Sequence, residues 1–224
     1  MQHIPSEKII SYDGVIELNL GELNLYYNEL GLNSFPKENR HDRNWSNASR
    51  QYWPQVQDPV ISFSSKSLIL ALSPKYICKI RLDGKQDIEI YNYQILNNNY
   101  PLFCRFEGVK VFSNGKKGII LERIKCLNKQ NYSSGELNRM YYNFLDRLQE
   151  LHSKGIIHND LKKANDSSQR PNIVISADQL RLIDCENIIF KETCSNWDNL
   201  LEEELSEVSD YFYELIDFKC NTLT

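Results

Sequence analysis

The feature that most constrains the fold of this 224-residue chain is the stretch from residue 151 to residue 186, LHSKGIIHNDLKKANDSSQRPNIVISADQLRLIDCE. It places His-Asn-Asp-Leu-Lys directly after a glycine and two isoleucines, and it puts a second aspartate at the end of a short apolar strand. Asp160 and Asp184 are therefore separated carboxylates with a lysine and an asparagine between them. These are the groups needed to hold a metal-bound nucleotide and to orient a hydroxyl for phosphoryl transfer.

In order and in hydrophobic frame, this stretch resembles the catalytic loop and the metal-binding strand of the protein kinase family. The resemblance is strong over these residues and fades toward both ends of the chain. It implies an α+β, bilobal protein-kinase-like fold, in which a five-stranded antiparallel sheet plus one helix forms the N-lobe and a mostly helical, truncated C-lobe follows. It also implies ATP and Mg²⁺ as cofactors and a serine or threonine hydroxyl of a protein as the acceptor.

The resemblance assigns roles to three residues of the loop. Asp160 is expected to accept or align the proton of the substrate hydroxyl, and Lys162 resembles the lysine that neutralises the transferring phosphate. His158 belongs to the same catalytic motif and is expected to hold the backbone of the loop rather than to transfer protons. An aspartate that follows a helix is by itself usually a cap or turn residue, so the catalytic interpretation depends on the surrounding motif.

Asp184 is the predicted magnesium-binding aspartate, because carboxylate oxygens are ligands that Mg²⁺ prefers. Two asparagines compete for the second metal position. Asn165 lies five residues after Asp160, as in the family, whereas Asn172 precedes the apolar run Ile-Val-Ile. We prefer Asn172, which makes KANDSSQ a seven-residue insertion in the loop. The family sequence Asp-Phe-Gly is Asp-Cys-Glu here, which implies that the usual switching between active and inactive states is lost.

Lys79 in the strand YICKI matches the lysine that grips the phosphates of the nucleotide. Its expected partner is a carboxylate on the following helix, for which Glu89 is preferred and Asp87 is the rival. The segment LERI resembles the connection between the lobes, where backbone groups of Glu122 and Ile124 would meet the adenine edge. An ordinary strand end is an equally good interpretation of that segment.

Three departures from the family imply a minimal kinase. The turn FSSKS, residues 63–67, has no glycine where the family covers the phosphates with a glycine-rich loop. Asn159 replaces the arginine that reads a phosphorylated activation loop, so the loop is expected to need no phosphorylation. Only 40 residues follow Asp184, too few for the full set of C-terminal helices. The chain thus resembles effector kinases that some bacteria inject into hosts, or compact RIO-type kinases.

Hydrophobic periodicity predicts the order of elements. Strands are expected at VISF, LILALS and YICKI, then a helix over 86–96, then strands CRFEGVKVF and KGIILERI that meet at Asn114-Gly115. Ser133 and Glu136 form a capping-box pattern before a helix that reaches Leu151. A second amphipathic helix is expected from about residue 197 to residue 218, with an outward acidic face made of Glu202, Glu203, Glu207, Asp210 and Glu214.

These patterns predict three parts: an N-terminal extension over 1–57, an N-lobe over 58–124 and a C-lobe over 125–224. The extension contains a hairpin signal at Asp13-Gly14 and helical spacing over 22–30, which Gly31 is placed to end. Its remainder is polar and dotted with aromatic residues, Trp45, Tyr52 and Trp53. Packing on its own domain is favoured over the alternative, a partner-binding arm.

Charge and cysteine usage exclude several classes of function. A formal net charge of −4 without a basic stripe argues against a nucleic-acid binder. The six cysteines never form a C-x-x-C pair, which argues against a zinc site. Scattered thiols predict reduced cysteines in the cytoplasm. If the chain is an effector, this would be the cytoplasm of a host cell. No apolar run approaches 18 residues, so no membrane span is expected.

Two alternative functions remain open. A pseudokinase would use the same fold to bind a partner or a nucleotide without turnover, which the missing glycines and the altered Asp-Cys-Glu sequence favour. A small-molecule kinase of the choline or aminoglycoside type would also contain His-Asn-Asp and Ile-Asp-x-Glu sequences. The short C-terminal part leaves little room for a metabolite pocket, so the protein-kinase interpretation is preferred.

Overall fold

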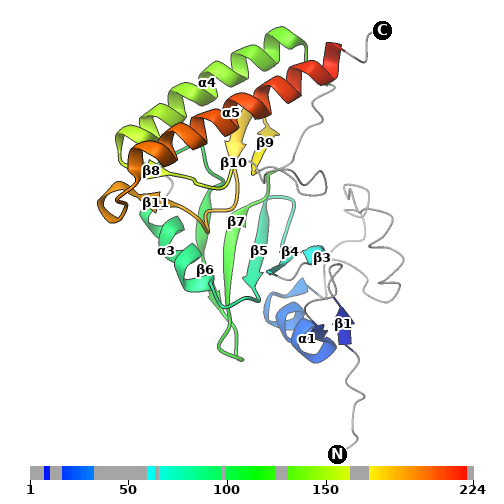
Figure 1. The fold of residues 1–224 in the computed structure, drawn as a ribbon. Helices are drawn as coiled ribbons and strands as arrows, with labels where there is room; N and C mark the ends of the chain where they lie inside the picture. The colour runs from blue at the N-terminus through cyan, green and yellow to red at the C-terminus, as the bar shows by residue number, and fades with distance from the viewer. Residues whose placement is uncertain are drawn as a thin grey trace, which may run out of the picture. The chain divides into compact units, whose positions relative to one another are not determined.

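The computed structural model of the chain describes residues 8–10, 17–32, 60–63, 66–96, 99–124, 131–161 and 172–220. The chain divides into two compact units. The first unit consists of residues 1–90 and 106–123, and the second unit consists of residues 91–105 and 124–224. Helices and antiparallel sheets make up both units (Figure 1), which agrees with the α+β class and is consistent with a kinase-like fold. The lobe boundaries proposed from the sequence stay predictions.

A five-stranded antiparallel sheet, ordered β3-β4-β5-β7-β6, forms the frame of the first unit. Its strands are β3 (Val60–Phe63), β4 (Ser67–Ala71), β5 (Tyr76–Arg81), β6 (Phe106–Val111) and β7 (Lys117–Glu122). Each strand lies within or next to a predicted run. The turn between β6 and β7 contains Gly115, whose φ of 82° is one that glycine adopts without a steric penalty.

The helix α3 (Gln86–Leu96) begins and ends at the predicted residues and contributes its part up to Ile90 to the first unit. The strand before it, β5, alternates its side chains between the two faces of the sheet. Cys78 and Ile80 therefore point to one face and Lys79 to the other. This alternation separates an apolar face, which builds the core of the first unit, from a charged face.

The N-terminal extension supplies part of that core. Its strands β1 (Lys8–Ile10) and β2 (Glu17–Asn19) pair as an antiparallel hairpin, and α1 (Leu20–Glu29) follows directly. Leu23 and Tyr26 of α1 are buried in one cluster with residues of β4 and β5, namely Leu68, Leu70, Cys78 and Ile80. Burying one such side chain contributes about 1.5–3 kcal/mol. The helix is thus an integral layer of this unit, whereas Trp45, Tyr52 and Trp53 lie outside the described residues.

Polar contacts fix α1 to the turn between β6 and β7. The ring of Tyr26 packs edge-on against Phe112 with 4.7 Å between centroids, and its hydroxyl accepts from the side chain of Asn114 at 3.2 Å. The Glu29 carboxylate accepts from the backbone N–H of Ser113 at 3.0 Å. The helix therefore has both an apolar and a polar attachment to the sheet.

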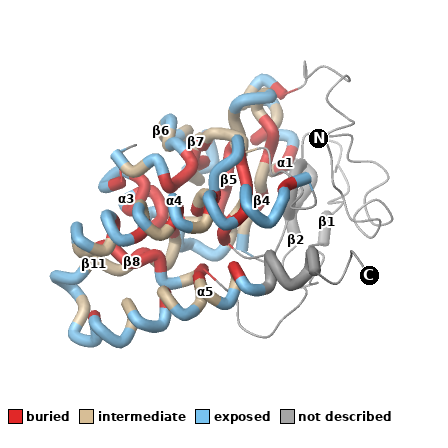
Figure 2. Tube along the Cα trace, turned by 90° about the horizontal axis from the view of Figure 1, so that it is seen from above, coloured by how far each residue is buried: buried red, intermediate tan, exposed pale blue. Residues whose placement is uncertain are grey.

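The second unit is built around two long helices, α4 (Ser134–Ser153) and α5 (Trp197–Cys220). Ser133 caps α4, and Glu136 completes the predicted capping box. The two helices lie side by side (Figure 1), and the rings of Tyr141 and Phe212 stack at 3.7 Å. The buried positions of α4 recur at helical spacing as predicted (Figure 2): Leu137, Met140, Phe144, Leu148 and Leu151.

Two short two-stranded antiparallel sheets complete the second unit. The strands β9 (Ile173–Ser176) and β10 (Gln179–Leu182) pair with each other, and β8 (Ile156–Ile157) pairs with β11 (Ile189–Phe190). A 3₁₀ turn, η4 (Lys191–Thr193), leads from β11 toward α5. Residues 158–161 follow β8, and residues 183–188 connect β10 to β11, the strand that pairs with β8. In the described part of the chain, no helix has both the length and the apolar character required to cross a membrane.

Candidate functional site

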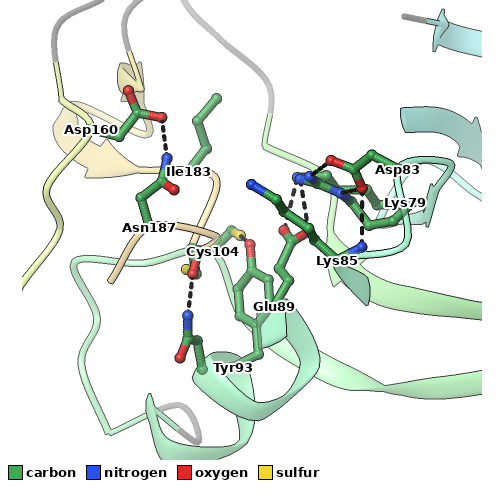
Figure 3. Close-up of polar contacts among 12 residues, drawn as sticks. Lys79, Asp83, Lys85, Glu89, Tyr93, Cys104, Asp160, Ile183 and Asn187 are labelled. Carbon is green, nitrogen blue, oxygen red and sulfur yellow. Dashed lines mark hydrogen bonds and ion pairs between the residues drawn. The ribbon is translucent and has the colours of Figure 1, made fainter. Parts of the chain in front are cut away.

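In the first unit, Lys79 of β5 forms a buried ion pair with Glu89 of α3. The Lys79 Nζ lies 2.8 Å from Glu89 Oε1 (Figure 3), and the two residues are 6% and 0% exposed. Of the two carboxylates that the sequence left open, Glu89 makes this contact, whereas Asp87 pairs with Lys117 at 2.7 Å. Nucleotide binding by Lys79 and Glu89 stays a prediction.

Arg81 extends this pair into a network of four charges. It lies two residues after Lys79 on the same face of β5, and its Nη1 is 3.6 Å from Glu89 Oε2. Asp83 binds the other side of the guanidinium. Burial raises the pKa of Asp83, but the hydrogen bond from Arg81 and other contacts outweigh this effect and hold the pKa below its ordinary value. Glu89 is therefore held by a second cation, a contact that was not predicted from the sequence.

In the second unit, β8 delivers the chain into His158, which is fully buried. Its ring lies parallel to that of Phe103, with centroids 6.0 Å apart, and its Nε2 lies 3.0 Å from the carbonyl oxygen of Ile183. Burial lowers the pKa of His158, although the carboxylates of Glu204, Asp184 and Asp160 act in the opposite direction. The neutral ring donates its Nε2–H to the carbonyl, so this histidine joins two backbone segments.

The depressed pKa of His158 predicts a stability that falls in mild acid. The unfolded chain takes up this proton below about pH 6.5, while the folded protein does so only at lower pH, so stability decreases as the pH falls through that window. We expect the melting temperature to drop between about pH 7.5 and 5.5 by more in the wild type than in His158→Gln, which keeps a donor but does not titrate. Equal drops in melting temperature in the two proteins would contradict a lowered pKa of His158 in the folded protein.

Asp160 follows His158 and is held at both its backbone and its side chain. Its carbonyl oxygen accepts from Asn172 Nδ2 at 2.7 Å, and its Oδ2 accepts from Asn187 Nδ2 at 2.9 Å (Figure 3). A second bond joins the N–H of Asn172 to the carbonyl of Leu161 at 3.1 Å. Asn172 thus closes the loop that begins at Asp160, even though twelve residues separate them.

Asp184 follows β10 with a left-handed backbone, φ 66°, a conformation that aspartate and asparagine tolerate better than most residues. The residue before it, Ile183, donates its N–H to the carbonyl of Asn172 at 3.0 Å and accepts from His158. The backbone therefore brings the two predicted metal ligands, Asn172 and Asp184, into one hydrogen-bonded cluster with the loop that carries His158 and Asp160.

The oxygen atoms of this cluster suit Mg²⁺. The Nδ2 of Asn172 donates to the carbonyl of Asp160, so its Oδ1 is the atom with which Asn172 could bind a cation. Within the described ranges, no group of three or more His, Cys, Asp and Glu side chains has the arrangement of a metal site. Mg²⁺ commonly uses only one or two protein carboxylates and completes its shell with phosphate oxygens and water. The residues present therefore fit a metal that arrives with a nucleotide.

Glu204 of α5 anchors the same loop, a role that the sequence did not predict. It is 2% exposed, and both of its oxygens are engaged. Oε1 lies 2.8 Å from His152 Nε2, and Oε2 accepts from the backbone N–H of Asn159 at 2.6 Å. Asn159 has a left-handed φ of 60°, so this bond stabilises an unusual backbone conformation directly before Asp160.

Several predicted positions lie outside the described residues or remain untested. Lys162, Asn165 and the KANDSSQ insertion lie outside them, as do the two serines at 64 and 65. Glu122 ends β7 opposite Tyr76, and Ile124 lies two residues further on. Their contact with adenine stays a prediction.

No protein-family model matches the sequence, and no curated protein sequence matches it. Among solved structures, the chain is similar to the kinase PK-1 of Cydia pomonella granulovirus, with 17% sequence identity and a TM-score of 0.38. The match covers 57% of this chain and 52% of that one, so the chain spans about half the length of the kinase structure.

Proposed function

We propose that the chain is an ATP- and Mg²⁺-dependent phosphotransferase that transfers the γ-phosphate to a serine or threonine hydroxyl of a protein. The observation that carries the proposal is the hydrogen-bonded cluster of the second unit. It joins His158, Asp160, Asn172 and the residue before Asp184 through three bonds of 2.7–3.0 Å. The buried pair of Lys79 and Glu89 in the first unit supports the same conclusion.

In the proposed reaction, the substrate hydroxyl oxygen forms a bond to the γ-phosphorus as the bond from phosphorus to the β–γ bridging oxygen breaks. The hydroxyl proton passes to the carboxylate of Asp160, and the products are a phosphoester and ADP. Lys79 binds phosphate oxygens of the nucleotide, with its ammonium oriented by Glu89. Lys162 offsets charge on the phosphate that is transferred.

Asn172 and Asp184 hold the metal in this proposal. Bound Mg²⁺ offsets the negative charge of the phosphates in the transition state. A backbone hydrogen bond of 3.0 Å joins the N–H of Ile183, the residue before Asp184, to the carbonyl of Asn172. The relative position of Asn172 and Asp184 therefore depends on main-chain bonds rather than on long side chains.

The test is incubation of the purified protein with γ-labelled ATP, a generic protein acceptor such as casein and either Mg²⁺ or excess chelator. We expect label on serine or threonine of the acceptor or of the protein itself, and no label with chelator. Label that persists in chelator contradicts the metal-dependent reaction.

The same assay separates the two alternatives. Label that appears only on a metabolite from a cell extract would identify a small-molecule kinase. A pseudokinase would transfer no label at all. The glycine-free sequence FSSKS favours this alternative, because backbone N–H groups approach phosphates most readily at glycine.

A further inference from the structure

The side chain of Asn187 holds the carboxylate that the proposed reaction uses. Asn187 lies three residues after Asp184, and its Nδ2 donates to Oδ2 of Asp160 at 2.9 Å (Figure 3). We propose that Asn187 is a positioning residue, which fixes the orientation of the Asp160 carboxylate so that its other oxygen faces the substrate hydroxyl. This inference rests on the proposed function, because it gives Asp160 the role of proton acceptor.

The backbone on both sides of Asn187 is tied down, which gives its amide a defined place. Two residues before it, Cys185 is fully buried, and its carbonyl accepts from the side chain of Asn92 at 2.7 Å. Two residues after it, Ile189 of β11 pairs with Ile157 of β8. Because Asp160 lies three residues after the end of β8 and Asn187 lies two residues before the start of β11, the pairing of these strands brings the amide donor and its acceptor close together.

The chemistry of the contact suits a carboxylate that must accept a proton. The terminal torsion of an aspartate side chain is broad, so the plane of a carboxylate is poorly fixed without a partner. A hydrogen bond to Oδ2 restricts this torsion and leaves Oδ1 directed toward the substrate hydroxyl in the proposed reaction. An amide donates without carrying charge and without titrating, so it leaves the charge of Asp160 unchanged. A misplacement of about 1 Å in a reacting group costs up to about 100-fold in rate.

The experiment compares Asn187→Leu, which loses the donor at similar size, with Asn187→Gln, which keeps an amide. The readouts are kcat and the KM for ATP in the γ-label assay, and the melting temperature. We expect kcat of Asn187→Leu to fall by about 10- to 100-fold, the range for a hydrogen bond to a charged group. The KM for ATP should stay within about twofold of the wild type, because the contact involves the hydroxyl-activating group and not the nucleotide. Asn187→Gln should retain more of the activity.

Asn143→Leu on the exposed face of α4 is the matched control and should leave kcat unchanged. A kcat of Asn187→Leu within about twofold of the wild type overturns the inference, and so does a raised KM for ATP with unchanged kcat. If Asn187→Leu does not fold, Asn187→Asp serves instead, since it keeps the shape but replaces the donor by a second acceptor. Wild-type kcat in Asn187→Asp would also overturn the inference. If the wild-type protein transfers no phosphate, the proposed function is overturned, and the positioning role of Asn187 is overturned with it.

Discussion

Asp184→Asn is expected to reduce phosphate transfer by about 1,000-fold or more while the protein stays folded, because loss of metal-mediated charge stabilisation costs several kcal/mol of transition-state energy. The substitution removes the negative charge and keeps the shape of the side chain. It also keeps a residue type that tolerates the left-handed backbone at this position, φ 66°. The loss of activity can then be assigned to the carboxylate and not to backbone strain. The measurement is the initial rate in the γ-label assay across a titration of Mg²⁺.

The chain offers a control with the same backbone conformation. Asp178 in the turn between β9 and β10 also has a left-handed φ, 59°, and its side chain accepts from the hydroxyl of Tyr132. Asp178→Asn should therefore match Asp184→Asn in backbone tolerance and keep full activity. Asp184→Ala should lose activity and also about 1–2 kcal/mol of unfolding free energy. Alanine lacks the short polar side chain whose local hydrogen bonds make the left-handed backbone conformation less costly. Full transfer activity in Asp184→Asn would contradict the metal-binding role.

Local signals explain why most of the elements were predictable from the sequence. The bounds of α3 follow from helical spacing after a polar break, and α4 begins at a capping box that uses residues only three positions apart. The strands of the sheet are short runs rich in apolar residues that polar breaks separate, and Gly115 marks the turn between two of them. Each of these signals is read within a short window, so no knowledge of distant contacts is needed.

The choice between Glu89 and Asp87 shows where this local information ends. Residues two apart on an α-helix differ in direction by about 200°, so the two carboxylates point to nearly opposite sides. Which side faces Lys79 depends on how the helix is rotated against the sheet, which is a tertiary property. The structure resolves it through burial, since Glu89 is fully buried and Asp87 is exposed. The contact of Asn187 with Asp160 likewise joins residues 27 positions apart.

Glu204 was missed for a different reason. It lies seven residues after Trp197 and four before Val208, both buried, so the spacing alone places it on the inner stripe of α5. The acidic composition around it suggested a solvated face, and Glu202, Glu203 and Asp210 are exposed as predicted. Glutamate is seldom buried without a partner. Its partners, His152 and the N–H of Asn159, lie 52 and 45 residues away, so the exception could not be seen locally.

Glu204→Leu is accordingly expected to destabilise the protein by about 3–5 kcal/mol, the cost of leaving buried polar partners unpaired. The substitution removes the acceptor of the Asn159 N–H, at 2.6 Å, and the partner of His152, at 2.8 Å. Glu204→Gln should lose less, because one amide oxygen can still accept from the backbone. Glu203→Leu, on the exposed face of the same helix, should change stability by no more than about 0.5 kcal/mol. Urea unfolding monitored by tryptophan fluorescence and circular dichroism gives the three values.

The activity of these variants tests whether α5 supports the proposed catalytic loop as well as the fold. Asn159 directly precedes Asp160, and its left-handed backbone, φ 60°, is held by the bond to Glu204. Under conditions where Glu204→Gln is fully folded, it should therefore lower kcat, because a weaker acceptor for the Asn159 N–H loosens the position of Asp160. The effect on the KM for ATP should be small, since the Lys79–Glu89 pair belongs to the other unit. If Glu204→Leu unfolds at the same urea concentration as Glu203→Leu, the buried carboxylate does not anchor the loop.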